Sequence, residues 1–202
     1  MKKTAFYLTL ILFTAITIKV DAKGEWISLF NGKDLTGWTP HGKATWTVQD
    51  GVLVGQGGMG HIYTDVTCSD FEFKGMFRIS STGAKSNSGV YFRANPPKDN
   101  PDGFPRGYEA QICNNQEAFT GWLWKPGTPT GKATELLTKD GEWFEYRIKA
   151  VGSHIKFWIN GKLVMSYEDS EYKTGHFAIQ CHNPGMKIEA KDMYYIDLDK
   201  KK

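Results

Sequence analysis

Apolar and polar residues alternate with a period of two along most of the chain. In residues 71–79 the odd positions are apolar or glycine, while Glu72 and Lys74 fall on the opposite face. Residues 143–150 and 155–159 alternate in the same way. A period of two is the pattern of a half-buried β-strand, so each segment is predicted to place one face in a core.

Turn signals divide the rest of the chain into further short strands. Asn160-Gly161 and Asp50-Gly51 are dipeptides typical of tight hairpins. Residues 94–106 hold four prolines and are predicted to form a loop, and residues 32–35 offer at most a short helical turn. Further strands are predicted at 45–48, 52–54, 88–93, 108–112, 163–167, 176–181 and 187–198. The pattern therefore predicts an all-β sandwich or barrel.

Composition narrows the class of protein. The chain has 202 residues, of which 40% are hydrophobic, 23% charged and 14% aromatic, and this balance excludes disordered and collagen-like chains. Its length suits one domain. The formal net charge is only +3, so a nucleic-acid partner is not expected. Seven Trp, nine Tyr and twelve Phe favour β structure.

The first 22 residues have the features of a signal peptide. Lys2 and Lys3 precede the uncharged apolar run 4–18, and Ala22 ends a small-residue cleavage site. The alternative is a membrane anchor, but Lys19 closes the run before the roughly 20 apolar residues that a span needs. We expect cleavage after Ala22, residues 23–202 as a single β-sandwich domain without a stable membrane span, and a periplasmic or secreted location.

Three cysteines are present, Cys68, Cys113 and Cys181. An exported protein could form one disulfide, and the sequence does not choose among the three pairings. Their spacing matches no zinc site, and we favour buried free thiols.

Six motifs occur in an order that resembles one known family. They are Trp26-Ile27-Ser28-Leu29-Phe30-Asn31-Gly32-Lys33-Asp34-Leu35-Thr36-Gly37-Trp38, Asn87-Ser88-Gly89-Val90-Tyr91-Phe92-Arg93, Gly107-Tyr108-Glu109-Ala110-Gln111-Ile112, Gly141-Glu142-Trp143, Asn160-Gly161 and the segment 175–182. The series is similar to the 3-keto-disaccharide hydrolase domain family. The resemblance implies a two-sheet antiparallel jelly roll of the concanavalin A-like lectin/glucanase type. It also implies an exported bacterial protein that acts on 3-keto-glucosides as a hydrolase or 1,2-lyase.

Strand parity places the polar residues of these motifs on one face. If the three strands share a sheet, that face presents Asn87, Tyr91, Arg93, Glu109, Gln111, Gln180 and His182. Amides, a carboxylate, a His and a Tyr are side chains that recognise sugar hydroxyls. Three tryptophans could stack on a pyranose ring, namely Trp122, Trp124 and Trp158. The expected partner is therefore a carbohydrate, a 3-keto-glucoside or an oligosaccharide.

The reaction implied by the resemblance assigns roles to this face. A ketone at C-3 acidifies the C-2 hydrogen, so a base can remove it and the oxygen on C-1 leaves by elimination. We assign Glu109 or His182 as the base, the other as the acid, and Arg93 with Gln111 as contacts of the enolate and hydroxyls. The simpler interpretation is a cross-strand ion pair between Glu109 and Arg93, with the other histidines structural or at the surface.

Other functional classes receive less support. A retaining β-glucanase would need E-x-D-x-x-E on one strand, and this string is absent. A non-catalytic carbohydrate-binding module or lectin stays open as an alternative function, because the sequence does not show how Glu109 is positioned.

No cofactor is certain, although Asp and Asn in residues 98–102 could ligate a divalent ion such as calcium. Many family members carry Asp where this chain has Asn114 or Asn115, and an Arg-Asn pair where it has Lys191-Asp192, so no metal ligand is assigned there.

Overall fold

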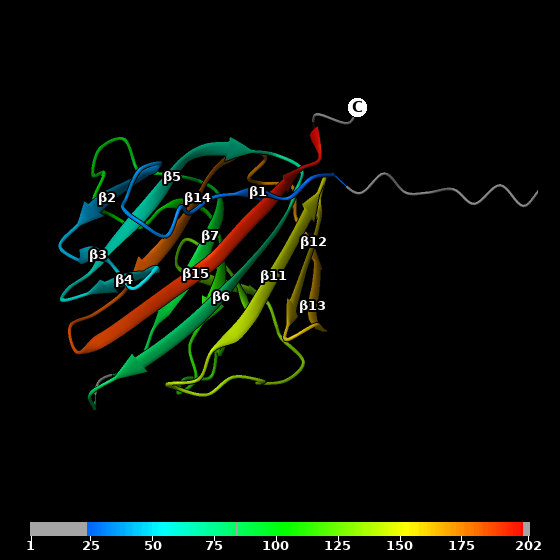
Figure 1. Cartoon of the computed structure of the whole chain (residues 1–202). Helices are drawn as coiled ribbons and strands as arrows, with labels where there is room; N and C mark the ends of the chain where they lie inside the picture. The colour runs from blue at the N-terminus through cyan, green and yellow to red at the C-terminus, as the bar shows by residue number, and fades with distance from the viewer. Residues whose placement is uncertain (1–23, 84, 200–202) are drawn as a thin grey trace, which may run out of the picture.

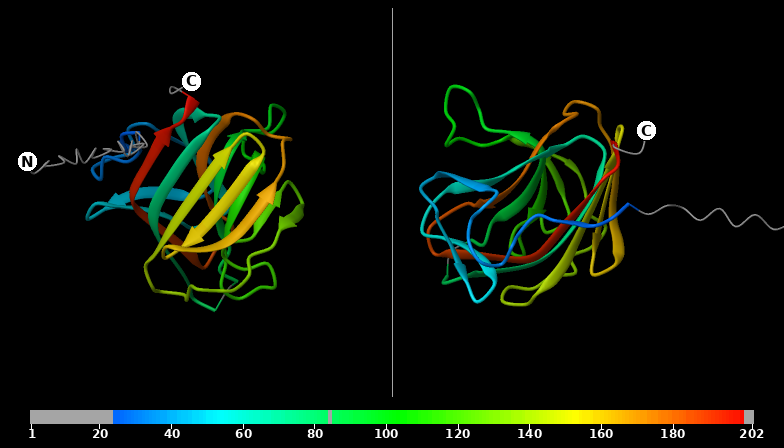
Figure 2. Two further views of the ribbon diagram at one scale, coloured as in Figure 1. Left: turned by 90° about the vertical axis from the view of Figure 1, so that its right-hand side faces the viewer. Right: turned by 45° about the horizontal axis from the view of Figure 1, so that its top comes forward.

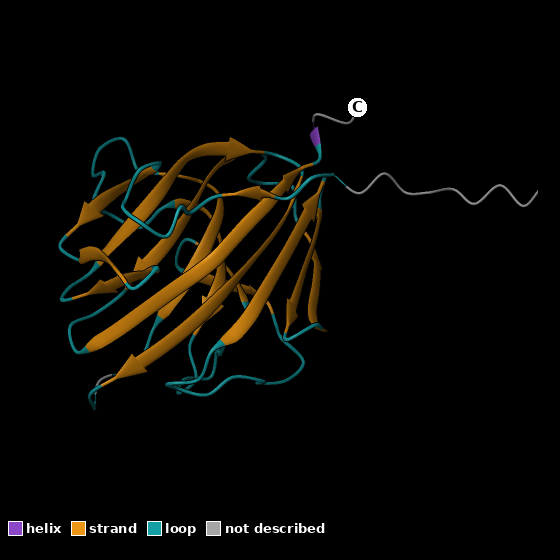
Figure 3. Ribbon diagram, viewed as in Figure 1, coloured by secondary structure: helices purple, strands orange, loops and turns teal. Residues whose placement is uncertain are grey.

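The computed structural model describes residues 24–83 and 85–199, and this part of the chain consists of strands joined by loops, with one short helical turn at its C-terminal end (Figure 3). The strands form two antiparallel sheets stacked as layers (Figure 1; Figure 2). The predicted all-β, two-sheet jelly roll is thereby confirmed. The predicted signal peptide, residues 1–22, lies outside the described residues.

The first sheet has eight strands. They are β1 Ile27–Ser28, β3 Thr45–Gln49, β4 Val52–Gln56, β6 Phe71–Ser81, β11 Phe144–Val151, β12 His154–Ile159, β13 Lys162–Glu168 and β15 Met186–Asp197. Seven of them follow the order β13-β12-β11-β6-β15-β4-β3, and β1 pairs with β15. The hairpin predicted at Asn160-Gly161 joins β12 to β13, and Asp50-Gly51 joins β3 to β4.

The second sheet has seven strands and carries the face of interest. They are β2 Trp38–Gly42, β5 Gly60–Cys68, β7 Ser88–Asn95, β8 Arg106–Ile112, β9 Leu123–Lys125, β10 Thr128–Gly131 and β14 Gly175–Cys181. Their order is β10-β9-β8-β7-β14-β5-β2, so β14 lies between two strands that come much earlier in the chain. The three strands that carry the polar motifs are therefore adjacent, as the parity argument required.

Aromatic rings fill the space between the sheets. Phe71 and Phe73 of β6 project into the core, where the Phe71 ring centroid lies 4.8 Å from that of Phe177 on β14 and 5.6 Å from that of Phe92 on β7. Each of these rings is buried, and such contacts join one sheet to the other. The alternation along 71–79 thus marks the core as predicted.

Strand β5 is one that the pattern did not predict. Its first five residues, Gly60 to Thr64, are buried on both faces, so the period of two is lost there. The edge strand β2 was also missed, and its Pro40 is typical of an edge position.

All three cysteines are buried and free, as favoured from the sequence. In the described part of the chain, no helix is long and apolar enough to cross a membrane.

Candidate functional site

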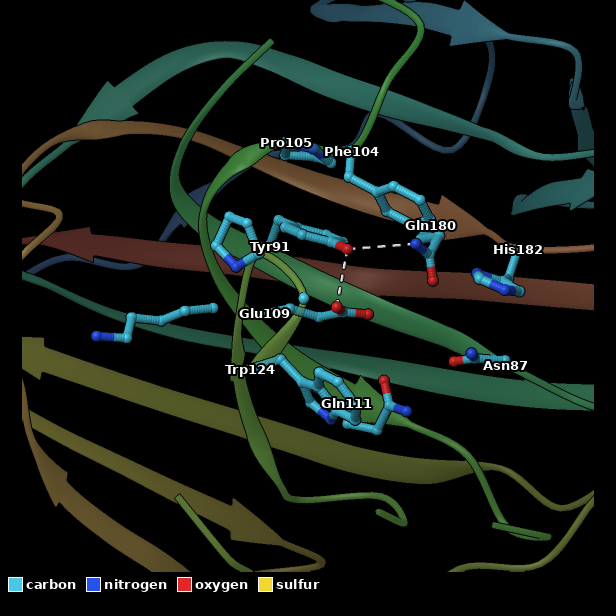
Figure 4. Close-up of a pocket in the computed structure, with 12 residues that line it drawn as sticks. Asn87, Tyr91, Phe104, Pro105, Glu109, Gln111, Trp124, Gln180 and His182 are labelled. Atoms are coloured by element: carbon cyan, nitrogen blue, oxygen red, sulfur yellow. Dashed lines mark hydrogen bonds between the residues drawn. The ribbon is translucent and has the colours of Figure 1, made fainter. Parts of the chain in front are cut away.

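A pocket of about 360 Å³ lies on the face of the second sheet that points away from the core (Figure 4). Its volume falls in the range of about 300–1,000 Å³ that is typical of small-molecule sites. It is lined by Asn87, Tyr91, Phe104, Pro105, Glu109, Gln111, Trp124, Lys125, Pro126, Gly127, Gln180 and His182.

Glu109 lies at the centre of a row that crosses three strands. On β8 it pairs in register with Tyr91 of β7 and with Trp124 of β9. Residues in register share a face of the sheet, so the three side chains point into the same pocket. The Glu109 carboxyl lies over Gly89, where a Cβ would collide with it. Glycine at this position therefore makes room for the carboxyl.

A chain of hydrogen bonds fixes one oxygen of Glu109. The Tyr91 hydroxyl donates to Glu109 Oε2 at 2.8 Å, and Gln180 Nε2 donates to the Tyr91 hydroxyl at 3.2 Å (Figure 4). Gln180 Nε2 also lies 3.3 Å from His61 Nε2. An amide nitrogen only donates, so His61 Nε2 accepts. The donor and the acceptor of every bond in the chain are therefore defined.

His61 supports the pocket although sequence reasoning left it among the structural or surface histidines. It lies on β5 in register with Gln180 and is fully buried. Its ring packs edge-on against Tyr91, with centroids 5.4 Å apart. Burial lowers its pKa to about 3, so the ring is neutral. Sequence reasoning missed this role because His61 lies on β5, a strand that the apolar pattern did not predict.

Burial sets the charge of the pocket. It raises the pKa of Glu109 to about 7, and the hydrogen bond from Tyr91 lowers that pKa only in part. Burial also lowers the pKa of His182. Lys125 lines the pocket, but its Nζ is held at 2.8 Å by Asp169 and at 2.8 Å by Glu171. Among the described residues no cation pairs with Glu109, so its carboxyl gains or loses a proton near neutral pH.

Several polar atoms of the lining are buried without a hydrogen-bond partner. They are Asn87 Oδ1, Trp124 Nε1, Gln180 Oε1 and His182 Nδ1. A buried polar group without a partner costs free energy, and native proteins seldom leave several together. A ligand rich in hydroxyl groups could supply both donors and acceptors to them.

The structure brings together seven of the ten residues predicted from the sequence. These are Asn87, Tyr91, Glu109, Gln111, Trp124, Gln180 and His182. Phe104 and Pro105 come from the predicted proline-rich loop, and Pro126 and Gly127 from the turn between β9 and β10. Strand parity gives no information on loop residues, so these four were missed.

The structure corrects the expected position of Arg93. A bulge breaks the pairing of β7 between Phe92 and Asn95, and Arg93 has a φ of 48°. The bulge turns its side chain away from the pocket. The guanidinium is 2% exposed and donates to the carbonyls of Ser69 at 2.7 Å and Gly152 at 2.8 Å.

Arg93 also forms its ion pair elsewhere than the simpler interpretation expected. Its Nη2 lies 3.3 Å from Asp70 Oδ1, whereas Glu109 bonds to Tyr91. The expected cross-strand pair between Arg93 and Glu109 is therefore wrong.

Two of the three candidate tryptophans lie outside the pocket. Trp122 is 7% exposed and packs in the core. Trp158 lies on the first sheet, where the Arg147 guanidinium covers its ring at 4.8 Å. Only Trp124 is placed to contact a ligand in this pocket.

Asp102 of the loop considered for calcium, and Asn114, where no ligand was assigned, both make hydrogen bonds within the protein. Asp102 Oδ1, in the loop considered for calcium, accepts from the backbone nitrogen of Gly42 at 2.8 Å. Asn114 Oδ1 accepts from the hydroxyl of Thr120 at 3.0 Å and that of Thr138 at 2.5 Å. Among residues 24–83 and 85–199, no three His, Cys, Asp or Glu side chains group to hold a metal ion.

The two sheets define a concanavalin A-like β-sandwich, and the family match places the protein in a carbohydrate-active class. Over residues 25–194 the sequence matches the family described as the 3-keto-alpha-glucoside-1,2-lyase-like domain. The chain belongs to this family, which confirms the resemblance carried by the six motifs.

Solved structures show the same fold. A "putative glycosyl hydrolase" from Parabacteroides distasonis is 25% identical, with a TM-score of 0.68 over 87% of this chain and 94% of that one. The carbohydrate binding module CBM66 from Bacillus subtilis is 17% identical, with a TM-score of 0.63 over 80% and 96%. A Bacillus subtilis protein of unknown function with a galectin-like fold is 12% identical, with a TM-score of 0.67 over 87% and 97%. No curated protein matches the sequence.

Proposed function

We propose that this protein cleaves 3-keto-glucosides by elimination, with Glu109 as the general base. The observation that carries the proposal is the state of this carboxyl. Burial raises its pKa to about 7, and Tyr91 holds one of its oxygens, which leaves the other for the substrate. A base whose pKa lies near the working pH removes a proton most effectively.

The elimination begins with the proton on C-2, which the ketone at C-3 acidifies. The Glu109 carboxylate takes this proton, and the electrons of the C–H bond form a double bond between C-1 and C-2. The C-1–O bond breaks and its electron pair leaves with the aglycone oxygen. Glu109, now a carboxylic acid, returns the proton to that oxygen. The products are an unsaturated 3-keto sugar and the free aglycone.

The remaining polar side chains bind and orient the sugar. His182 is neutral because burial lowers its pKa, so its ring N–H donates a hydrogen bond to the leaving oxygen rather than a proton. The amides of Asn87, Gln111 and Gln180 contact the sugar hydroxyls and the enolate oxygen. Trp124 packs against the ring. Arg93 has no part in this scheme because it lies outside the pocket.

The direct experiment compares a glucoside with the same glucoside oxidised at C-3. We expect the protein to release the aglycone from the 3-keto form only, together with a product whose conjugated C=C–C=O group absorbs in the ultraviolet. Cleavage of the unoxidised glucoside at an equal rate would contradict the proposal, since C-2 is not acidic without the ketone.

A carbohydrate-binding module is the second candidate function. The likeness to CBM66 and the amide-rich lining of the pocket favour it. It predicts that the oxidised and the unoxidised glucoside both bind and that neither is cleaved. Calorimetry and product analysis on the same samples therefore separate the two functions.

Export to the periplasm or the medium is also proposed, on the basis of residues 1–22. Expression of the full chain in a bacterial host and N-terminal sequencing of the exported protein test it. The expected mature N-terminus is Lys23, and retention of Met1 in an uncleaved product would contradict it.

A further inference from the structure

A second cavity, of about 410 Å³, adjoins the pocket. It is lined by Lys85, Asn87, Gln116, His182 and Asn183. Asn87 and His182 line both cavities, and they lie at the same end of the pocket in Figure 4. A ligand longer than one sugar ring could therefore extend from the pocket past these two residues.

The topology explains why these five residues meet. Lys85 and Asn87 lead into β7, Gln116 follows β8, and His182 with Asn183 follows β14. The three strands are neighbours in the order β8-β7-β14. The cavity thus lies at one end of the row of strands that also carries Glu109.

The chemistry of this lining differs from that of the pocket. The pocket has the rings of Tyr91, Phe104 and Trp124, whereas the second cavity has three amides, one ammonium and one imidazole. An aromatic or alkyl group placed there would leave these polar groups without hydrogen bonds, which is costly. A group rich in hydroxyls would satisfy them.

Three residues of the second lining have a buried acceptor or ring nitrogen without a partner. They are Asn87 Oδ1, His182 Nδ1 and Asn183 Oδ1. The Asn183 amide nitrogen donates to the carbonyl of Pro184 at 2.9 Å, whereas its buried oxygen has no hydrogen-bond partner. Lys85 is exposed and makes no ion pair with any described residue, so its ammonium is available to a ligand oxygen.

We propose that the second cavity is a leaving-group subsite that binds a hydroxyl-rich aglycone, such as a second sugar, through Lys85, Gln116 and Asn183. This inference rests on the proposed function. The 3-keto ring occupies the pocket beside Glu109, and the bond to be broken lies where the two cavities meet, at Asn87 and His182. Lys85, Gln116 and Asn183 then determine which leaving group is accepted.

The test measures binding by calorimetry in a Glu109→Gln background, where turnover is expected to be strongly reduced. Three 3-keto-glucosides are compared, with a second glucose, a phenyl group or a methyl group as the aglycone, in both α and β linkages. We expect one glucose-bearing ligand to bind about tenfold tighter than the methyl ligand, and the phenyl ligand to gain nothing.

Two variants assign that gain to the subsite. The double substitution Gln116→Leu and Asn183→Leu is expected to remove the tenfold gain and to leave the affinity for the methyl ligand unchanged. Gln49→Leu, at an exposed position of β3, is the matched control and should change neither affinity. Equal affinities for the sugar and methyl ligands, or tighter binding of the phenyl ligand, would overturn the inference.

Failure of the proposed function gives a different result. In that case the wild-type protein cleaves none of the three ligands, while the preference in binding for the sugar aglycone and its loss in the double variant persist.

Discussion

The Tyr91 hydroxyl and the Glu109 carboxyl lie opposite each other on adjacent strands and share a hydrogen bond of 2.8 Å. The hydroxyl can donate to Glu109 because it accepts from Gln180, whose nitrogen also lies 3.3 Å from His61 Nε2. The Gln180 amide nitrogen, which only donates, thus sets the direction of the bonds to Tyr91 and His61. The chain orients the carboxyl without supplying a charge to it.

Glu109→Gln should reduce turnover of a 3-keto-glucoside by about 10²- to 10⁴-fold, the usual contribution of a general base. The amide keeps the shape of the carboxyl but does not accept the C-2 proton. Steady-state kinetics checks this, with Glu142→Gln at an exposed loop position as the control. If both variants kept wild-type turnover, Glu109 would not be the base.

The activity should fall as the pH is lowered through about 7, because the base must be ionised and the pKa of Glu109 is about 7. Tyr91→Phe removes a hydrogen bond that lowers this pKa, so the pKa rises and the acidic limb of kcat/KM moves to higher pH. Profiles of the two proteins measure the shift. Tyr63→Phe is the control, since its buried hydroxyl has no partner among the described residues. An acidic limb that stayed in place in Tyr91→Phe would argue against this role.

The same carboxyl should destabilise the folded protein at high pH. Its pKa rises from 4.5 to about 7 on folding, so the folded state disfavours the charged form. The destabilisation is absent below pH 4.5, grows between 4.5 and 7, and reaches at most about 3 kcal/mol above 7. Glu109→Gln should therefore be more stable than wild type at pH 8 and similar at pH 4.5, as measured by urea denaturation. A gain of the same size at both pH values would refute the linkage.

Gly89→Ala should impair catalysis more than folding. A Cβ at this position would meet the Glu109 carboxyl, so the side chain must move away from the Tyr91 hydroxyl. We expect kcat to fall about tenfold or more, since small displacements of a catalytic group are costly. Kinetics and a crystal structure of the variant check the displacement. Gly51→Ala is the contrasting variant: its Cβ meets nothing within 4 Å, but the φ of +80° strains the turn, so stability should fall while kcat stays near that of wild type.

The substitution Arg93→Ala should lower the free energy of unfolding by about 3–5 kcal/mol. It removes the charge that Arg93 places beside the buried carboxylate of Asp70. Lys162→Ala removes an exposed ion pair with Glu135 and should cost only about 0–1 kcal/mol. Chemical denaturation compares the two. In the folded fraction of Arg93→Ala, we expect kcat to remain near that of wild type. A large loss of kcat with unchanged stability would show instead that Arg93 takes part in the reaction.

The fold was predictable wherever one face of a strand is buried and the other is not. Residues 71–79 are an example, because a half-buried strand requires apolar and polar residues to alternate. Strand β5 was not predictable in this way, since both of its faces are covered near His61. The missed strand explains the missed histidine.

By itself, the sequence determined the all-β class, the family and the polar face that carries Glu109 and Gln180, because strand parity is a local property. Only the tertiary structure decided which of those residues share a pocket. A bulge moves Arg93 out of the pocket, and loops bring Phe104 into it. The pKa of Glu109 likewise depends on burial by segments distant in sequence, and no local pattern encodes that burial.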